Sequence, residues 1–104
     1  MAGWRSQKAR LRERIDQSRK EIDAILAQRD AKDREIALIR KELAMVQQLH
    51  DKQLTNVVRL IGMQRELARF EGERSSLMAQ MARVESHIKE IELQVVELEQ
   101  RLMT

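Results

Sequence analysis

The side chains best able to do chemistry in this chain are two histidines, and neither is part of a recognisable site. His50 and His87 lack the second histidine or the convergent carboxylates that hold a metal ion in proteins. His87 and Glu90 stand one helical turn apart, a spacing that is common by chance. The chain has no cysteine, no serine–histidine–aspartate arrangement and no glycine-rich phosphate loop. We therefore expect no metal, no cofactor and no enzymatic activity.

Basic side chains gather in the first 20 residues. Seven Lys or Arg stand there against two acids, a balance of +5 within a net charge of +3. Such a cluster can contact the phosphates of nucleic acid or lipid. Glu13 and Asp16 interrupt it and no base-reading motif follows, so a solvated helix start is the simpler interpretation and we expect no nucleic-acid partner. The cluster consists of Arg5, Lys8, Arg10, Arg12, Arg14, Arg19 and Lys20.

The composition is typical of long solvated helices. Charged residues make up 36% of the chain and apolar residues 42%, with no Pro, one Trp and one Phe. Strands use β-branched and aromatic residues between frequent turn formers, which are rare here. The regular recurrence of Leu, Ile, Val and Met argues against disorder. No apolar run is long enough for a membrane span or a signal peptide.

Apolar residues follow a heptad pattern in two separate runs. Steps of four and three residues alternate in both, as in the seam of a coiled coil. Polar residues interrupt the first run at positions 18, 29 and 32, and the second run at position 74. The first run is Leu11, Ile15, Ser18, Ile22, Ile25, Arg29, Lys32, Ile36, Ile39, Leu43 and Val46. The second is Leu60, Met63, Leu67, Phe70, Arg74, Leu77, Met81, Val84, Ile88, Ile91, Val95, Leu98 and Leu102.

The two runs are out of phase, which predicts a turn between them. In the intervening segment the apolar spacing lapses, and either Thr55 or Asn56 could cap a new helix. We predict an all-α fold, a long two-helix antiparallel coiled-coil hairpin. It forms a single domain with one helix over about 5–50, a tip over about 51–55 and a second helix over about 56–103. The alternative is a continuous helix with a stutter near residue 53, acting as a parallel dimerisation rod in a structural protein.

Folding at about residue 53 places opposite one another residues whose numbers sum to about 106. Val46 then faces Leu60, and Ile15 faces Ile91. Each arm would be about 65 to 70 Å long at 1.5 Å per residue, a dimension suited to a spacer.

Three cations fall in the predicted seam, close to four acids. We expect their long stems to cover the seam while their charged ends reach water or the acids. The alternative is that this polar layer fixes the register of the helices or loosens the hairpin locally. The cations are Arg29, Lys32 and Arg74, and the acids are Asp30, Asp33, Glu71 and Glu73.

Small or apolar residues also recur every seven positions outside the seam. They suggest flanks that pack laterally on copies of the hairpin, although alanine is also simply the best helix former. Ser75 and Lys89 interrupt the second set. The predicted lateral residues are Ala24, Ala31, Leu38 and Met45 in the first helix, and Ile61, Ala68, Ala82 and Val96 in the second.

The order of several short stretches resembles a known family. The stretches are LHDKQL at 49–54, Arg59-Leu60, QRELARFEGER at 64–74 and IKEIELQ at 88–94. Together they resemble the α-helical hairpin of HlyD-like periplasmic adaptors, also called membrane fusion proteins, of type I secretion. Similarity extends more loosely over residues 11–42 and so covers most of the chain.

The resemblance implies a function that heptads alone do not. Adaptors of this family are anchored in the inner membrane of Gram-negative bacteria and project the hairpin through the periplasm. Copies, typically six, line up as a tube whose tips meet a TolC-like outer-membrane channel. An ABC transporter supplies the energy and contacts other parts of the adaptor. The chain is then expected to be a piece of a longer, inner-membrane-anchored adaptor that bridges transporter and channel.

The resemblance also implies a docking site at the tip. Adaptor tips often show Arg, then Leu four residues later, then Ser seven residues beyond. Leu49 matches the Leu, but Met45 and Asn56 occupy the other two places, and aligning Thr55 with the Ser puts Gln48 at the Leu. The predicted channel-docking residues are Leu49, His50, Lys52, Leu54, Thr55 and Asn56.

Overall fold

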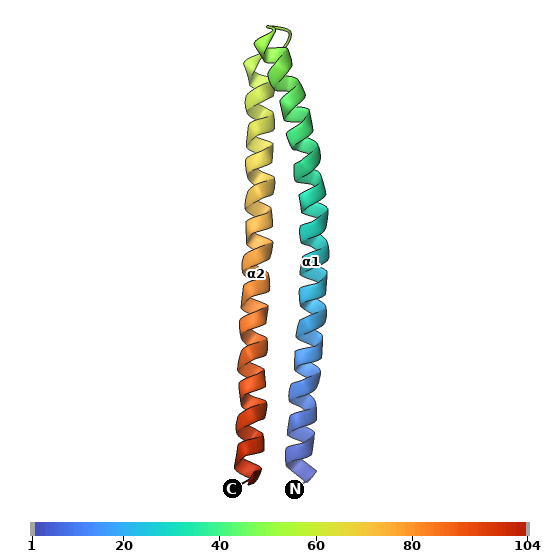
Figure 1. The fold of residues 1–104 in the computed structure, drawn as a ribbon, viewed down its shortest axis with the longest axis vertical. Helices are drawn as coiled ribbons and strands as arrows, with labels where there is room; N and C mark the ends of the chain where they lie inside the picture. The colour runs from blue at the N-terminus through green and yellow to red at the C-terminus, as the bar shows by residue number, and fades with distance from the viewer. Residues whose placement is uncertain (1, 104) are drawn as a thin grey trace. The chain divides into compact units, whose positions relative to one another are not determined.

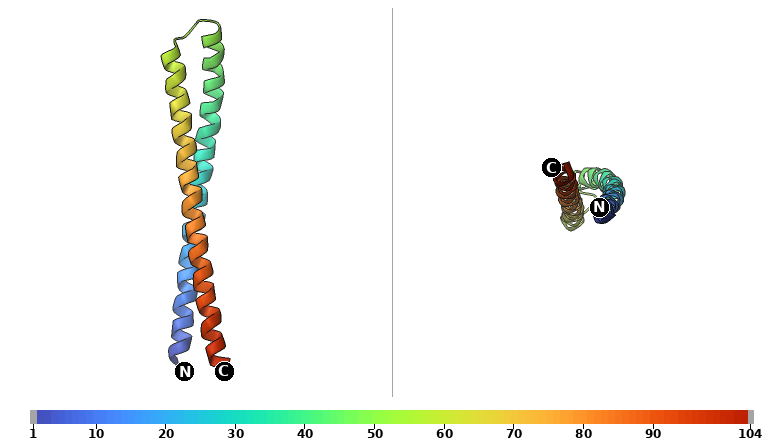
Figure 2. Two further views of the ribbon diagram at one scale, coloured as in Figure 1. Left: turned by 90° about the vertical axis from the view of Figure 1, so that its left-hand side faces the viewer. Right: turned by 90° about the horizontal axis from the view of Figure 1, so that it is seen from below.

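The computed structural model describes residues 2–103, and these residues form two helices with no strand. Helix α1 spans Ala2–Asp51 and helix α2 spans Val57–Met103. The chain divides into two compact units: unit 1 comprises residues 2–26 and 79–103, and unit 2 comprises residues 27–78 with the turn. Within each unit the two helices run side by side in opposite directions (Figures 1 and 2). The predicted all-α antiparallel hairpin is therefore confirmed.

Helix α1 ends in a hydrogen-bonded turn around Gln53. The φ angle of Gln53 is 60°, in the left-handed region. The Leu54 N–H donates to the Leu49 carbonyl at 2.7 Å, and the Gln53 N–H donates to the His50 carbonyl at 2.9 Å. These two bonds are those of a Schellman motif, whose left-handed position is usually glycine. The helix thus has a defined end although residues 50–56 contain neither Gly nor Pro.

Helix α2 begins with a side-chain cap. Asn56 Oδ1 accepts a hydrogen bond from the Arg59 N–H at 3.0 Å, the bond that an N-cap residue makes to the third helical position. Of the two predicted caps, Thr55 and Asn56, the structure selects Asn56. The expected helix bounds, about 5–50 and about 56–103, agree with the observed bounds to within three residues.

The core of each unit is the predicted seam. In unit 1, Ile15, Ile88 and Ile91 form one buried cluster, and Ile91 is only 1% exposed. All large apolar side chains that are buried in residues 2–103 belong to the two heptad runs. Burial of each is worth up to about 1.5 to 3 kcal/mol. The buried large apolar side chains of unit 2 are Ile36, Ile39, Val46 and Leu60.

Contact between Ile15 and Ile91 requires the backbone to reverse direction. A continuous rod would separate these residues by more than about 100 Å at 1.5 Å per residue. The start of α1 and the end of α2 accordingly lie at the same end of unit 1 (Figure 1). Between residues 2 and 103, neither helix holds an apolar stretch able to cross a membrane.

Candidate functional site

Large apolar side chains are exposed around the turn. Leu54 is 70% exposed and Val58 is 73% exposed, and exposure continues along α2 through Val57 and Ile61. Val57 and Val58 lie four and three residues before Ile61, so the three share one side of the helix. Exposed apolar side chains gathered in one place are typical of an interaction surface. We call Leu54, Val57, Val58 and Ile61 the tip patch.

The six predicted docking residues differ in their availability to a partner. Lys52 and Leu54 are exposed on the turn. Asn56 is exposed too, but its side-chain oxygen caps α2. The other three, Leu49, His50 and Thr55, are half-buried. Leu54 is therefore the predicted residue with the largest apolar surface free for contact.

Sequence reasoning did not single out two members of the tip patch, Val57 and Val58. The available signal was a pair of adjacent valines directly after the helix cap, outside both heptad runs. Valine is a weak helix former, so two of them exposed at a helix start have no evident role in local stability. They extend the apolar surface of the turn into α2.

The predicted lateral residues lie on the surface. Leu38 is 60% exposed and Met45 is 65% exposed, and Ile61 and Val96 are exposed to a lesser degree. The alanines are exposed except for Ala31, which is half-buried. We call Ala24, Ala31, Leu38 and Met45 the α1 stripe, and Ile61, Ala68, Ala82 and Val96 the α2 stripe.

In unit 2 the two stripes turn toward opposite faces of the hairpin. Arg40 Nη2 donates to Glu71 Oε1 at 3.0 Å, so the flanks that carry these residues form one face. Each residue advances about 100° around a helix with 3.6 residues per turn. Leu38 therefore lies across the α1 seam from Arg40, whereas Ile61 lies on the same side of the α2 seam as Glu71. Each face of unit 2 thus carries the stripe of one helix.

Four charged residues of unit 2 form two ion pairs across the helices. Lys32 Nζ donates to Glu73 Oε2 at 2.6 Å, and Arg74 Nε donates to Asp33 Oδ1 at 2.5 Å. The prediction that the charged ends in the seam reach nearby acids is confirmed for both cations. We call Lys32, Asp33, Glu73 and Arg74 the ionic layer.

The surroundings of the ionic layer shield its lysine from water. The Lys32 ammonium lies 4.6 Å from the centre of the Phe70 ring, within range of a cation–π interaction, and the side chain is only 16% exposed. Arg69 covers the same ring at 5.1 Å. The third seam cation, Arg29, bonds Asp30 on its own helix at 2.8 Å.

Ion pairing shifts three pKa values. The hydrogen bond with Lys32 holds the pKa of Glu73 below its ordinary value of 4.5, and the same bond raises the pKa of Lys32 above 10.5. In unit 1, the hydrogen bond from Lys8, 2.5 Å from Glu99, lowers the pKa of the Glu99 carboxyl below 4.5. These groups therefore keep their charges, and their cross-helix attraction, at neutral pH.

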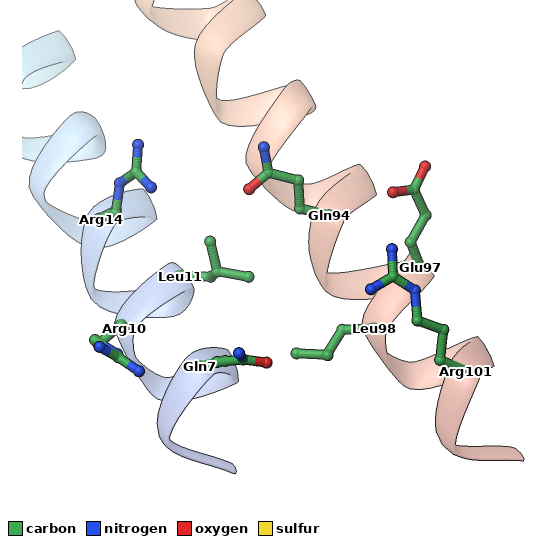
Figure 3. A pocket seen from close by; sticks show the side chains of 8 residues that line it. All are labelled: Gln7, Arg10, Leu11, Arg14, Gln94, Glu97, Leu98 and Arg101. Carbon is green, nitrogen blue, oxygen red and sulfur yellow. The ribbon is translucent and has the colours of Figure 1, made fainter. Parts of the chain in front are cut away.

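A cavity of unit 1 lies between the first turns of α1 and the last turns of α2. It measures about 450 Å³ and is an open groove between the helices. Leu11 and Leu98 point into the space between α1 and α2, with arginine and glutamine side chains around them (Figure 3). Its lining belongs partly to the basic cluster of the first helix. The lining residues are Gln7, Arg10, Leu11, Arg14, Gln94, Glu97, Leu98 and Arg101.

The histidines fall in different units and neither has a metal-binding set around it. The covered Nδ1 of His50 makes no hydrogen bond and lies 3.9 Å from the Asp51 carboxylate. His87 Nδ1 lies 3.9 Å from the Glu90 carboxylate, one helical turn away. Within residues 2–103 no group of three or more His, Cys, Asp or Glu could hold a metal ion.

The antiparallel seam, the capped turn and the exposed flanks are those of a long helical hairpin. A family described as "AprE, long alpha-helical hairpin" matches residues 1–104. The chain belongs to this family. The match confirms the resemblance to adaptors of type I secretion, a family that is not enzymatic in kind. The AprE family implies a periplasmic, membrane-anchored protein. No curated protein and no solved structure matches the chain.

Proposed function

We propose that this AprE-family hairpin bridges an inner-membrane ABC transporter and a TolC-like outer-membrane channel in type I secretion. The observation that carries the proposal is the tip patch. It places Leu54 and Val58, each more than two-thirds exposed, at the turn of a hairpin from an adaptor family. Apolar side chains exposed to water add no stability to a spacer, whereas burying them against a partner is favourable.

The proposed mechanism is passive. The paired helices set the distance, and the tip docks on the periplasmic end of the channel. Apolar contact by the tip patch would supply most of the docking energy, because burying apolar area is worth about 25 cal/mol per Å². Lys52 adds a charge at the rim, where charges affect the rate of encounter and the choice of partner more than affinity. The transporter would contact the adaptor outside the hairpin, where the adaptor is anchored in the inner membrane.

Lateral contact between copies is the second part of the proposal. Leu38 and Ile61 lie on opposite faces of unit 2, so the α1 stripe of one copy can meet the α2 stripe of the next. A contact between two different surfaces repeats from copy to copy and closes into a ring when the rotation allows it. This arrangement supports a tube of hairpins, which we propose to be a hexamer in the full-length adaptor.

Truncating the tip patch tests the docking proposal. In the adaptor that carries this hairpin, Leu54→Ala with Val58→Ala should abolish export of the secreted substrate. The melting temperature of the hairpin should stay nearly unchanged, because surface truncations usually change stability by less than about 0.5 kcal/mol. Leu93→Ala is the matched control, since Leu93 is an exposed leucine of unit 1 far along the chain from the turn. Export at the wild-type rate by the tip variant would refute the docking assignment.

Introducing charge into one stripe tests the lateral proposal separately. Leu38→Glu with Met45→Glu should reduce chemical cross-linking between adaptor copies, because it places carboxylates in an apolar contact. The helix content and melting temperature should be preserved, since both side chains are exposed. Undiminished cross-linking would show that the α1 stripe is not an interface.

A further inference from the structure

The ionic layer joins two adjacent residues of one helix to two adjacent residues of the other. On α1 the order of charges is positive then negative, at Lys32 and Asp33. On α2 the order is negative then positive, at Glu73 and Arg74. Lys32 and Asp33 are neighbours on α1 and their partners Glu73 and Arg74 are neighbours on α2, so both hydrogen bonds lie at one level of unit 2. The layer is complementary in one alignment of the two helices.

The apolar seam alone does not single out that alignment. Its heptad repeat returns apolar residues to the interface when one helix slides by seven residues, about 10 Å. The charges respond differently to sliding. A shift in one direction places Asp33 opposite Leu67 and Arg74 opposite Leu26, although Lys32 then faces Glu66. A shift in the other direction places Arg74 opposite Arg40 and Lys32 opposite Gln80. Either shift breaks both ion pairs of the layer.

Partial burial makes the loss of these partners costly. Lys32 is largely covered, lies over the Phe70 ring and donates to Glu73. A shielded charge that loses its partner is disfavoured more strongly than an exposed one, whereas apolar replacement of a whole ion pair is often neutral or stabilising. Groups of this kind select one alignment among several of similar apolar burial.

We propose that the ionic layer fixes the register of α1 against α2 independently of the turn. The turn is then free to carry a sequence that suits the partner of the tip, because the helices stay aligned without its help. The proposal does not depend on docking or on the lateral assembly. It assigns Lys32, Asp33, Glu73 and Arg74 a positioning role.

The test removes the influence of the turn. Residues 52–56 are replaced by a flexible Gly/Ser linker of about ten residues, and spin labels are attached through Gln28→Cys and Gln64→Cys, both exposed positions of unit 2 in a chain without native cysteine. These two positions are offset along the helix axis, so sliding of one helix lengthens or shortens the distance between the labels. The distance distribution between the labels reports register. With the ionic layer intact, one narrow distance is expected, equal to that of the hairpin with its native turn.

Two altered layers are then compared in the linker protein. Lys32→Glu with Asp33→Lys places like charges opposite Glu73 and Arg74. We then expect a second population of molecules in which one helix has slid along the other by seven residues, about 10 Å. Adding Glu73→Lys and Arg74→Glu to these changes restores complementarity and should restore the single distance. The four-charge exchange also shows that the altered residues are tolerated in the fold.

Replacing the whole ionic layer by apolar residues provides an independent test. Lys32→Leu, Asp33→Ala, Glu73→Ala and Arg74→Leu together should leave helix content intact and broaden the distance distribution into several registers. If the apolar and mismatched variants both keep the single wild-type distance, the turn-independent role of the layer is overturned.

Discussion

Replacing Gln53 by glycine should make the hairpin more stable. Gln53 has a φ of 60°, and a non-glycine residue in this left-handed region costs about 1 to 2 kcal/mol. Glycine removes that cost but loses about 0.5 to 1 kcal/mol more backbone entropy on folding. The net gain should be about 0.5 to 1 kcal/mol. For a chain of this size the melting temperature should rise by roughly 2 to 8 °C, measured by circular dichroism.

The same substitution five residues earlier is the matched control. Gln48 lies in the last part of α1, is exposed, and has a helical backbone. Glycine inside a helix is less favourable by about 0.5 to 1 kcal/mol, so Gln48→Gly should lower the melting temperature. One chemical change thus has opposite effects at two neighbouring glutamines. If Gln53→Gly destabilises the protein as Gln48→Gly does, α1 continues through residue 53 and the assigned turn is wrong.

Two further predictions concern the seam and its ion pairs. Ile91→Ala should cost about 2 to 5 kcal/mol in denaturant unfolding because Ile91 is fully buried, whereas Leu93→Ala, at 57% exposure, should cost less than about 0.5 kcal/mol; equal losses would argue against the seam. Glu73 and Glu99 have a lowered pKa in the folded chain, so their ion pairs stabilise it above pH 4.5 and this contribution is lost as the pH falls below that value. Thermal melts between pH 7 and pH 3 should show a smaller acid-induced decrease for Glu73→Gln with Glu99→Gln than for the wild type, and an identical decrease would contradict the pairing.

The heptad pattern was sufficient to predict the fold because coiled-coil packing is repetitive. Each seam position faces a similar apolar position, so the phase change near residue 53 and the rule that paired residues sum to about 106 determine most contacts. The contact of Ile15 with Ile91 follows from this rule. The acids near Lys32 and Arg74 could also be named, since charged stems in a seam must end at water or at opposite charges.

The turn was harder to predict because its usual signal is absent. A glycine normally marks the left-handed position of a helix end, and here Gln53 occupies it at a cost in backbone energy. The exposed valines of the tip patch were missed for a related reason. Heptad analysis describes what is buried between helices, whereas Val57 and Val58 lie outside both runs. The choice of partners for each cation likewise depends on side-chain geometry that spacing alone leaves open.

The distance between the two arms of unit 1 tests the central claim most directly. Spin labels at Gln17→Cys and Lys89→Cys occupy exposed positions, close in sequence to Ile15 and Ile91, respectively. Two helices side by side, each about 10 to 12 Å across, should keep the labels within about 30 Å in a dilute monomeric sample. A separation of more than about 100 Å, the length expected for an unbroken helix between these positions, would contradict the hairpin.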